Sequence, residues 1–381
     1  MFGRTRKTQT VVIIGMGDTG VLVAARLSKH FRVIGIATKP NLVSGQELGK
    51  RLTDLSWWQH HYNMPLNRFK ALNDVALVHG RAHSVDPPTK TVTVCAPDNS
   101  QQTLSYDYLV VASGTSNGFW RDDVVRSSTQ ISDLLTADAA HIESANTVAV
   151  IGGGPCGVSS ALNIQRAYPK KRVSLYLSGT APLPGYHEQA QHYYENELVT
   201  AGVEVLKNHR AVITDVPPRA GNVDFESGDT TSADAIIWTI GNRKPHTGFL
   251  PSDYLDEDGF VNTLPTLEVA GDDTMFAIGD VASTDPERSS ARNWAYGILV
   301  HNLKRKATGT AADKIYSPPT HLWGSLVPPQ YDGLTLHQET GKRMRLSPWL
   351  VDHVLLPPVV QRFISKGLDR APDRHFLRRD R

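Results

Sequence analysis

The stretch VVIIGMGDTG at residues 11–20 joins a β-branched apolar run to three glycines, and VAVIGGGPCG at residues 148–157 repeats this pattern. Both copies have the spacing G-x-G-x-x-G and lead into a helical pattern of apolar residues. The first glycine of such a motif makes a tight turn, the second lets a pyrophosphate approach the backbone, and the third packs helix against strand. Free N–H groups at the start of the helix then face the phosphates. The two copies predict two dinucleotide-binding sites, at Gly15, Gly17 and Gly20 and at Gly152, Gly154 and Gly157.

A second strand pattern follows each helix, FRVIGIAT at residues 31–38 and RVSLYLSG at residues 172–179. Alternating strands and helices predict an α/β fold. We expect two Rossmann-like domains, each with three layers around a parallel sheet, together with inserted antiparallel strands and a small C-terminal module. The expected bounds are residues 1–118 and 248–310 for the two parts of the first dinucleotide domain, 119–247 for the second domain and 311–381 for the C-terminal module.

The composition is that of an ordinary globular protein. Of its 381 residues 20% are charged and the formal net charge is +2, so the charge gives no reason to expect a nucleic-acid partner. The two cysteines, Cys95 and Cys156, are too few for a disulfide scaffold or a cysteine-rich metal site, and we expect no metal. The sequence shows no apolar run long enough to span a bilayer and no secretory signal pattern. We therefore expect a cytoplasmic protein whose contact with membranes, if any, is peripheral.

Both glycine motifs lack a residue that usually accompanies them. An acidic residue at the end of the second strand commonly binds the ribose hydroxyls of the dinucleotide. Ala37 or Thr38 occupies this place in the first unit, and Leu177 or Ser178 occupies it in the second. We expect Thr38 to bind the ribose in the first unit. The second unit carries neither an acid that would repel a 2′-phosphate nor a nearby arginine that would select one, so NADH and NADPH both stay open.

Five segments together carry a family resemblance: residues 11–20, YDYLVVASGT at 106–115, residues 148–157, AIIWTIGNRKP at 235–245 and VNTLPTLEVAGDDTMFAIGDVAS at 261–283. Over roughly residues 10–305 the chain resembles the two-dinucleotide flavoproteins of the pyridine nucleotide-disulfide oxidoreductase superfamily. The resemblance implies FAD in the first site and NADH or NADPH in the second. It implies that Asp280 binds the ribityl chain of FAD and that Arg51 lies against its pyrophosphate, although Lys50 and Arg51 are also read as a solvated charge pair. It further assigns Ser113, Gly114 and Gly279 to the FAD site and Gly241 to the nicotinamide site.

The two cysteines lie 61 positions apart, so the chain lacks the closely spaced redox pair of disulfide reductases. The reduced flavin is therefore expected to pass electrons directly to an outside acceptor. In length and layout the chain is most similar to the apoptosis-inducing-factor-like branch, which includes ferroptosis suppressor protein, and to single-subunit NADH:quinone oxidoreductases. This similarity implies an NAD(P)H oxidoreductase with a quinone acceptor. The alternatives are a reductase for a small carrier protein such as a ferredoxin, and a non-catalytic sensor that binds the same cofactors.

One departure from this branch falls in the second motif. Relatives usually read Gly-Val-Glu there, with the glutamate near the nicotinamide and the flavin, whereas this chain reads Gly157-Val158-Ser159. Ser159 can form hydrogen bonds but carries no charge. We assign it to the nicotinamide site and expect the nicotinamide to be placed differently. Cys156 is expected to be a small residue of the loop without a catalytic role.

Two further segments allow two interpretations each. LSWWQHHYNMP at residues 55–65 is either a helix that packs domains together or a wall of the acceptor pocket. SPWLVDHVLLPPVVQRFISKGLDR at residues 347–370 contains an amphipathic helix pattern, and residues 362–381 hold seven Lys and Arg against three Asp. This C-terminal part either caps the body of the protein or lies on an anionic membrane surface. The sequence does not determine the oligomeric state.

Overall fold

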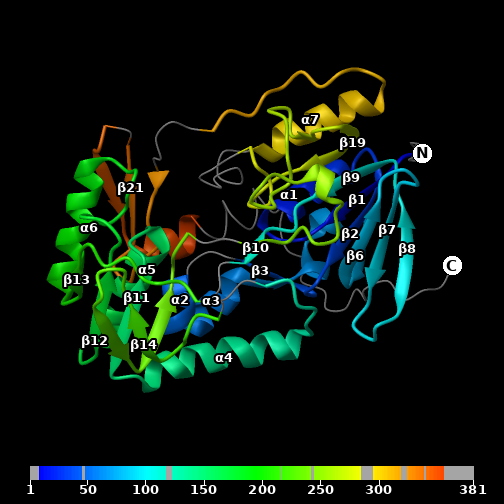
Figure 1. The fold of residues 1–381 in the computed structure, drawn as a ribbon. Coiled ribbons are helices and arrows are strands. Elements are labelled where there is room, and N and C mark those ends of the chain that lie inside the picture. The colour runs from blue at the N-terminus through cyan, green and yellow to red at the C-terminus, as the bar shows by residue number, and fades with distance from the viewer. Residues whose placement is uncertain are drawn as a thin grey trace.

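Each of the two glycine motifs lies at the end of a strand in its own parallel sheet. The structure is a computed structural model that describes residues 8–44, 48–116, 122–214, 216–241, 244–284, 295–318, 324–338 and 340–355. The two sheets occupy separate lobes, as Figure 1 shows, with the labels β1, β2 and β9 in one and β11, β12 and β13 in the other.

The first lobe is built on a six-stranded sheet with the order β18–β19–β9–β1–β2–β5. β18 runs antiparallel to β19, and the other neighbours are parallel. The strands β18 and β19, which come after the strands of the second lobe in the sequence, therefore complete the sheet of the first lobe. The strands are β1 (Thr10–Ile14), β2 (Arg32–Ala37), β5 (Val75–His79), β9 (Tyr108–Val111), β18 (Glu268–Val269) and β19 (Asp272–Ala277).

The alternation of side chains along β1 explains why this strand is apolar throughout. Val11 and Ile13 lie in a core shared with helices α1 (Asp18–Leu27) and α7 (Ala295–Ala307). Val12 and Ile14 lie in a second core on the opposite face, against an antiparallel sheet of β6 (Arg81–Asp86), β7 (Thr91–Cys95) and β8 (Gln101–Ser105). Since both faces of β1 are buried, the strand is a continuous apolar run instead of an alternating one.

The second lobe repeats this arrangement on a four-stranded parallel sheet with the order β13–β12–β11–β16. The helices α5 (Pro155–Ala167) and α6 (Glu188–Ala201) cover one face, and the hairpin of β14 (Gly221–Asp224) and β15 (Thr230–Ala233) covers the other. The strands are β11 (Thr147–Ile151), β12 (Arg172–Tyr176), β13 (Glu204–Leu206) and β16 (Ala235–Trp238). The predicted α/β fold with two Rossmann-like sheets and inserted antiparallel strands is confirmed.

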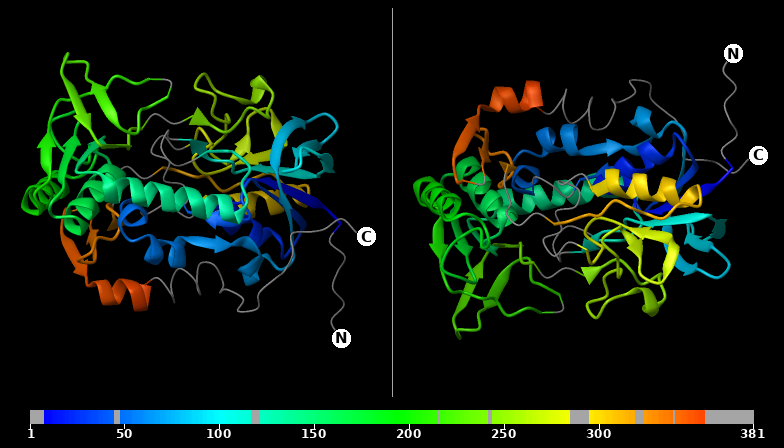
Figure 2. Two further views of the ribbon diagram at one scale, coloured as in Figure 1. Left: turned by 90° about the horizontal axis from the view of Figure 1, so that it is seen from below. Right: turned by 90° about the horizontal axis from the view of Figure 1, so that it is seen from above.

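The chain crosses between the lobes on two neighbouring strands, β10 (Thr115–Ser116) and β17 (Lys244–Pro245), which pair antiparallel. Helix α4 (Ser128–Ser144) follows the first crossing and runs lengthwise across the molecule, as the left view of Figure 2 shows. The short helix α2 (Leu48–Thr53) packs on both α4 and α5, and α3 (Leu55–Tyr62) follows it and packs on α4. The domain bounds expected at residues 118 and 247 stay a prediction.

The C-terminal part contains a small antiparallel sheet of β20 (Gly324–Ser325), β21 (Leu334–His337) and β22 (Arg343–Leu346), followed by helix α8 (Pro348–Leu350). It packs on the second lobe, where the ring of His337 contacts Tyr193 and Tyr194 of α6. The amphipathic helix and basic tail expected beyond residue 355 lie outside the described residues. Within the described ranges no helix is long and apolar enough to cross a membrane.

The remaining elements are β3 (Asn41–Val43), β4 (Asn63–Pro65), and the 3₁₀ turns Leu66–Arg68, Lys70–Leu72 and Ser252–Tyr254.

Candidate dinucleotide sites

The first glycine motif forms a tight cradle between β1 and α1. Gly15 has φ +101°, and a Cβ atom added there would lie 2.3 Å from the carbonyl oxygen of Ala112. A Cβ on Gly20 would lie 1.9 Å from the carbonyl oxygen of Gly15, so helix and turn are in direct backbone contact. A Cβ on Gly17, by contrast, would meet no described atom within 4 Å. The cradle is therefore closed at its first and third glycines and open at the second, as a bound pyrophosphate requires.

The second motif has the same geometry between β11 and α5. Gly152 has φ +114°, and a Cβ on Gly157 would lie 1.9 Å from the carbonyl oxygen of Gly152. A Cβ on Gly154 would meet no described atom within 4 Å. Pro155 begins the helix, where its missing N–H leaves no hydrogen bond unmade. This cradle also has its open face at the second glycine.

Thr239 is a site residue that the sequence did not reveal. Its hydroxyl donates to the carbonyl oxygens of Ile151 (2.9 Å) and Gly152 (3.0 Å), which fixes the turn of the second cradle. It follows β16 directly, as Ala112 follows β9 in the first lobe. The sequence signals Thr239 only through this position after a strand, equivalent to that of Ala112, and the equivalence is recognised only once the strand order is known.

The structure brings Gly279 to the first cradle. This glycine follows β19, has φ +85°, and would place a Cβ 3.4 Å from the hydroxyl of Thr19 in the first turn of α1. The parallel pairing of β19 with β9 puts the carboxyl ends of both strands at one edge of the sheet. Asp280 follows Gly279 directly and is half-buried. Its contact with FAD stays a prediction.

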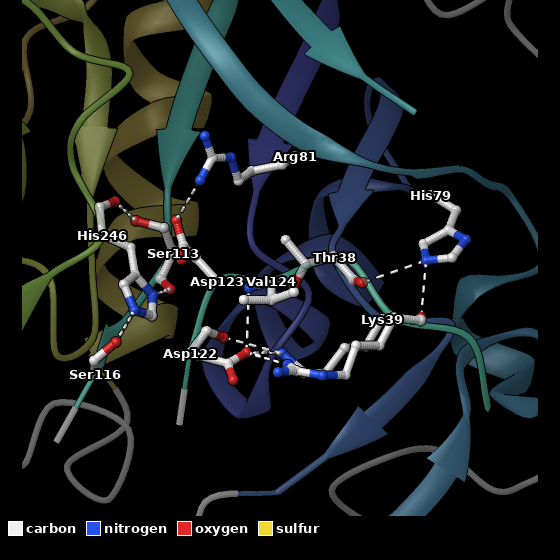
Figure 3. A network of polar contacts seen from close by, with 11 residues as sticks. Thr38, Lys39, His79, Arg81, Ser113, Ser116, Asp122, Asp123, Val124 and His246 are labelled. Atoms are coloured by element: carbon white, nitrogen blue, oxygen red, sulfur yellow. Dashed lines mark hydrogen bonds and ion pairs between the residues drawn. The ribbon is translucent and has the colours of Figure 1, made fainter. Parts of the chain in front are cut away.

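Ser113 and Gly114 lie where the chain leaves the first lobe. The Ser113 hydroxyl donates to the backbone carbonyl of His246 (2.6 Å), and the Nδ1 of His246 donates to the carbonyl of Ser113 (3.0 Å). The Nε2 of the same ring then accepts from the Ser116 hydroxyl at 2.7 Å (Figure 3). Gly114 has φ +72° and accepts from the backbone of His246. The two residues join the crossing strands, and their assignment to FAD stays a prediction.

Thr38 lies at the end of β2, where the acid is missing. Its carbonyl oxygen accepts the backbone N–H of Arg126 (2.9 Å) and the Nε2 of His79 (3.3 Å). The segment after residue 121 therefore lies along this strand end and brings the carboxylate of Asp122 to it, in contact with Lys39 (Figure 3). Asp122 is a second residue of this site that the sequence did not reveal.

Lys50 and Arg51 are both buried, so they are not the solvated charge pair that the sequence also allowed. Arg51 is 3% exposed and forms an ion pair with Asp138 of α4 at 3.3 Å. The Lys50 ammonium lies 4.0 Å from the ring centre of Tyr331 and 3.6 Å from the carboxylate of Asp54. The structure thus gives Arg51 a protein partner, and its contact with the pyrophosphate stays a prediction.

Helix α3 packs domains together, as one of its two interpretations expected. Trp58 and Tyr62 lie in a buried cluster with Ile131 and Leu135 of α4. Trp57 is half-buried, and its indole N–H donates to Asp352 at 3.1 Å, which ties α3 to the C-terminal part.

Ser159 lies in a buried polar cluster under α2. It has no exposed surface, and its hydroxyl oxygen accepts from Nδ2 of Asn163 (3.3 Å) and Nε2 of Gln330 (3.1 Å). A Cβ on Gly49 of α2 would approach its carbonyl oxygen to 2.7 Å. The hydroxyl is thus turned into the protein, with Gln330 supplied from 171 residues away. The assignment of Ser159 to the nicotinamide site stays a prediction.

Gly241 and the cysteines complete the expected set. Gly241 follows β16 at the edge of the second cradle, and a Cβ there would meet no described atom within 4 Å. Cys95 and Cys156 are both half-buried and form no disulfide, and Cys156 lies in the first turn of α5. The chain therefore has no disulfide in this structure.

Two parallel sheets, each with a glycine cradle open at its second glycine, define a protein that binds two dinucleotides. The chain belongs to the pyridine nucleotide-disulphide oxidoreductase family, whose model matches residues 9–296. The cofactors of this family are FAD and NAD(P)H, and both cradles fit a dinucleotide because each offers an open backbone face at a helix N-terminus.

Among curated relatives, oxidoreductase ptaL from Pestalotiopsis fici is 29% identical over 214 residues, which cover 55% of this chain and 56% of that protein. Apoptosis-inducing factor homolog B from Dictyostelium discoideum is 23% identical over 337 residues, which cover 82% of this chain and 84% of that one. The chain thus spans little more than half the length of ptaL.

Two solved structures show the same fold. Reduced CoADR-RHD from Bacillus anthracis has a TM-score of 0.66 at 16% identity, over 93% of this chain and 64% of that one. NDH2 from Plasmodium falciparum in complex with NADH has a TM-score of 0.58 at 17% identity, over 72% of this chain and 64% of that one.

Proposed function

We propose that the protein is an FAD-dependent NAD(P)H oxidoreductase that passes electrons directly to a quinone-type acceptor. One observation carries the proposal: the chain holds two dinucleotide cradles, and its two cysteines, 61 positions apart in the sequence, form no disulfide. A disulfide relay therefore has no second thiol, and a small redox-active acceptor has to meet the flavin itself. The quinone class follows from the resemblance to quinone-reducing branches of the family.

The residues of the chain bind and orient the cofactors. Gly15 and Gly20 fix the first turn, and the open face at Gly17 exposes the N–H groups of α1 to the FAD diphosphate. Gly152 and Gly157 do the same for NAD(P)H at the N-terminus of α5. When bound, NAD(P)H would supply a hydride and FAD would accept it, and the part of the protein would be to bind and orient the two cofactors.

The C-terminal part supports the packing of the two lobes. The Tyr331 hydroxyl donates to the carbonyl oxygen of Thr53 at the end of α2, and Gln330 donates to Ser159 of α5. Both contacts connect residues 330–331 to elements that lie beside the second cradle. We propose that this part also holds the protein at a membrane surface, where a lipophilic quinone is found.

A membrane contact fits the surface of the C-terminal part. Trp349 is 62% exposed, and Val354 and Met344 are exposed as well. The exposed Lys342 and Arg343 lie beside Met344 in the sequence. An apolar group next to basic side chains suits an anionic lipid surface. Co-sedimentation with anionic vesicles tests this part of the proposal, and binding that is equal for the wild type and the Trp349→Ala variant contradicts it.

The electron-transfer proposal is tested on the purified, FAD-loaded protein under anaerobic conditions. NADH or NADPH is expected to bleach the flavin, and a soluble quinone is expected to restore its absorbance over many turnovers. Restoration by a ferredoxin but not by a quinone favours the carrier-protein reductase instead. A flavin that binds but is bleached by neither nucleotide favours the non-catalytic sensor.

The same assay tests the absence of a thiol relay. Cys95→Ser and Cys156→Ser are each expected to leave reoxidation by quinone intact. A variant whose flavin is still reduced by NAD(P)H but no longer reoxidised would show that a thiol takes part and would refute direct transfer.

A further inference from the structure

The segment that connects the first lobe to α4 is fastened to the end of β2. The backbone N–H of Arg126 donates to the carbonyl oxygen of Thr38 at 2.9 Å. The Nε2 of His79, at the end of β5, lies 3.3 Å from the same carbonyl and 3.1 Å from that of Arg126, and donates to both. Figure 3 shows His79, Thr38 and Lys39 together at this strand end. The segment therefore lies where the missing acid of the first cradle would be.

Asp122 presents a carboxylate at this place. Its Oδ1 atom accepts from the Arg126 guanidinium, from Lys39 Nζ at 3.3 Å and from the backbone N–H of Val124 at 3.1 Å. Lys39 Nζ also donates to the carbonyl oxygen of Asp122 at 3.0 Å. Every contact described for the carboxylate is made by Oδ1, and the side chain is 39% exposed. These contacts hold the carboxylate in one orientation, and among the described residues Oδ2 accepts no hydrogen bond.

The carboxylate is ionised at neutral pH. Burial by itself raises the pKa of Asp122, but the hydrogen bond from Arg126 and the charge of Lys39 outweigh this effect and hold the pKa below its ordinary value. Two cations thus stabilise the anion through hydrogen bonds to Oδ1.

We propose that Asp122 is the acid that binds the adenosine ribose of FAD in the first cradle, in place of the residue that β2 lacks. The acid comes from the connecting segment instead of the strand, and the Oδ2 atom accepts hydrogen bonds from the ribose hydroxyls. This inference rests on the assignment of FAD to the first cradle.

Asp123 is next to Asp122 but has a different environment. Its carboxylate pairs with Arg81 of β6 at 3.2 Å, and both side chains are exposed. An exposed pair of this kind contributes little to stability, so Asp123→Asn, which removes the same charge one residue away, provides a matched control.

The test measures binding of FAD by the apoprotein, followed by quenching of flavin fluorescence. FAD is compared with an analogue that lacks both hydroxyls of the adenosine ribose. Hydrogen bonds to a charged group are strong enough that Asp122→Asn is expected to weaken FAD binding about tenfold or more. The same variant is expected to bind the analogue as the wild type does, and Asp123→Asn is expected to match the wild type with both ligands.

The outcomes separate the inference from the assignment on which it rests. An Asp122→Asn variant that binds FAD like the wild type overturns the inference. A variant that loses the same factor for FAD and for the analogue also overturns it, because Asp122 then only shapes the segment. A wild-type protein that binds no FAD refutes the cofactor assignment itself.

Discussion

Substitution of Ser159 tests whether the polar cluster under α2 is as closed as the structure shows. The hydroxyl oxygen accepts from Asn163 and Gln330 and has no contact with solvent. Ser159→Ala removes this acceptor, but Nε2 of Gln330 keeps a hydrogen bond of 2.8 Å to the carbonyl oxygen of Pro328. Nδ2 of Asn163 likewise keeps its bond to the carbonyl oxygen of residue 159, so we expect the free energy of unfolding to fall by about 1–2 kcal/mol for the two hydrogen bonds that are lost.

Ser159→Glu, which introduces the residue found in relatives, is expected to be far more destabilising. A Cβ on Gly49 would already lie 2.7 Å from the carbonyl oxygen of Ser159, so α2 leaves little room for a longer side chain. The amides of Asn163 and Gln330 can donate to the new carboxylate, but the ammonium of Lys50 lies against Tyr331. A carboxylate introduced into this buried and closely packed cluster is expected to cost about 3–5 kcal/mol at neutral pH.

This cost depends on pH with a definite sign. Burial raises the pKa of the introduced carboxyl in the folded state above its ordinary value of about 4.3 in the unfolded chain. The loss of stability is thus complete above the folded-state pKa and becomes smaller as the pH falls toward about 4.3.

Urea unfolding of the apoproteins, followed by tryptophan fluorescence at about pH 7.5 and about pH 5.5, measures both effects. Ser159→Ala is the size control and should show no comparable difference between the two pH values. A Ser159→Glu protein as stable as the wild type at neutral pH refutes the reasoning. It would mean that the side chain points to the nicotinamide and not into the cluster.

Three further predictions follow from the same structure. Gly20→Ala is expected to lower both the FAD content and the stability, because its Cβ would lie 1.9 Å from the carbonyl oxygen of Gly15. Gly17→Ala is expected to lower the FAD affinity but to keep the melting temperature of the apoprotein, since its Cβ would meet no described atom within 4 Å. Arg51→Met is expected to lower the free energy of unfolding in urea by about 2 kcal/mol, because the buried ion pair with Asp138 is lost while the Asp138 carboxylate keeps its ion pair with Arg219. An unchanged midpoint of unfolding would contradict this. Burial lowers the pKa of His337 in the folded state, so the wild type should lose stability as the pH falls below about 6.5, the value in the unfolded chain. His337→Phe should reduce this slope in melting experiments, and an unchanged slope would show that other groups cause it.

Much of the fold could be predicted because it depends on local patterns. The glycine spacing in residues 11–20 and 148–157 requires turns that only glycine permits, as the positive φ angles of Gly15 and Gly152 confirm. The apolar runs beside them predicted strands of three-layer domains, and the cores on both faces of β1 and of β11 agree with that arrangement. Family membership followed from the order of the motifs and is confirmed by the match over residues 9–296.

The partners of single polar side chains could not be predicted in this way. Arg51 pairs with Asp138, which lies 87 residues further along the chain. Tyr331 and Trp57 both engage residues that are almost 300 positions away in sequence. Such pairs depend on how complete elements pack, and no local spacing encodes them.

The sequence by itself determined the two cradles, because the turn, the close helix contact and the open backbone face each need a glycine at a fixed position. Only the tertiary structure decided what surrounds them. The sequence showed that the acid of β2 is missing, but the packing of the connecting segment on Thr38 brings Asp122 to that place. Likewise, only the packing of α2 and of Gln330 encloses Ser159. The physical reason is the same in both cases: backbone geometry is a local property, whereas burial and pairing depend on segments that meet only in the folded chain.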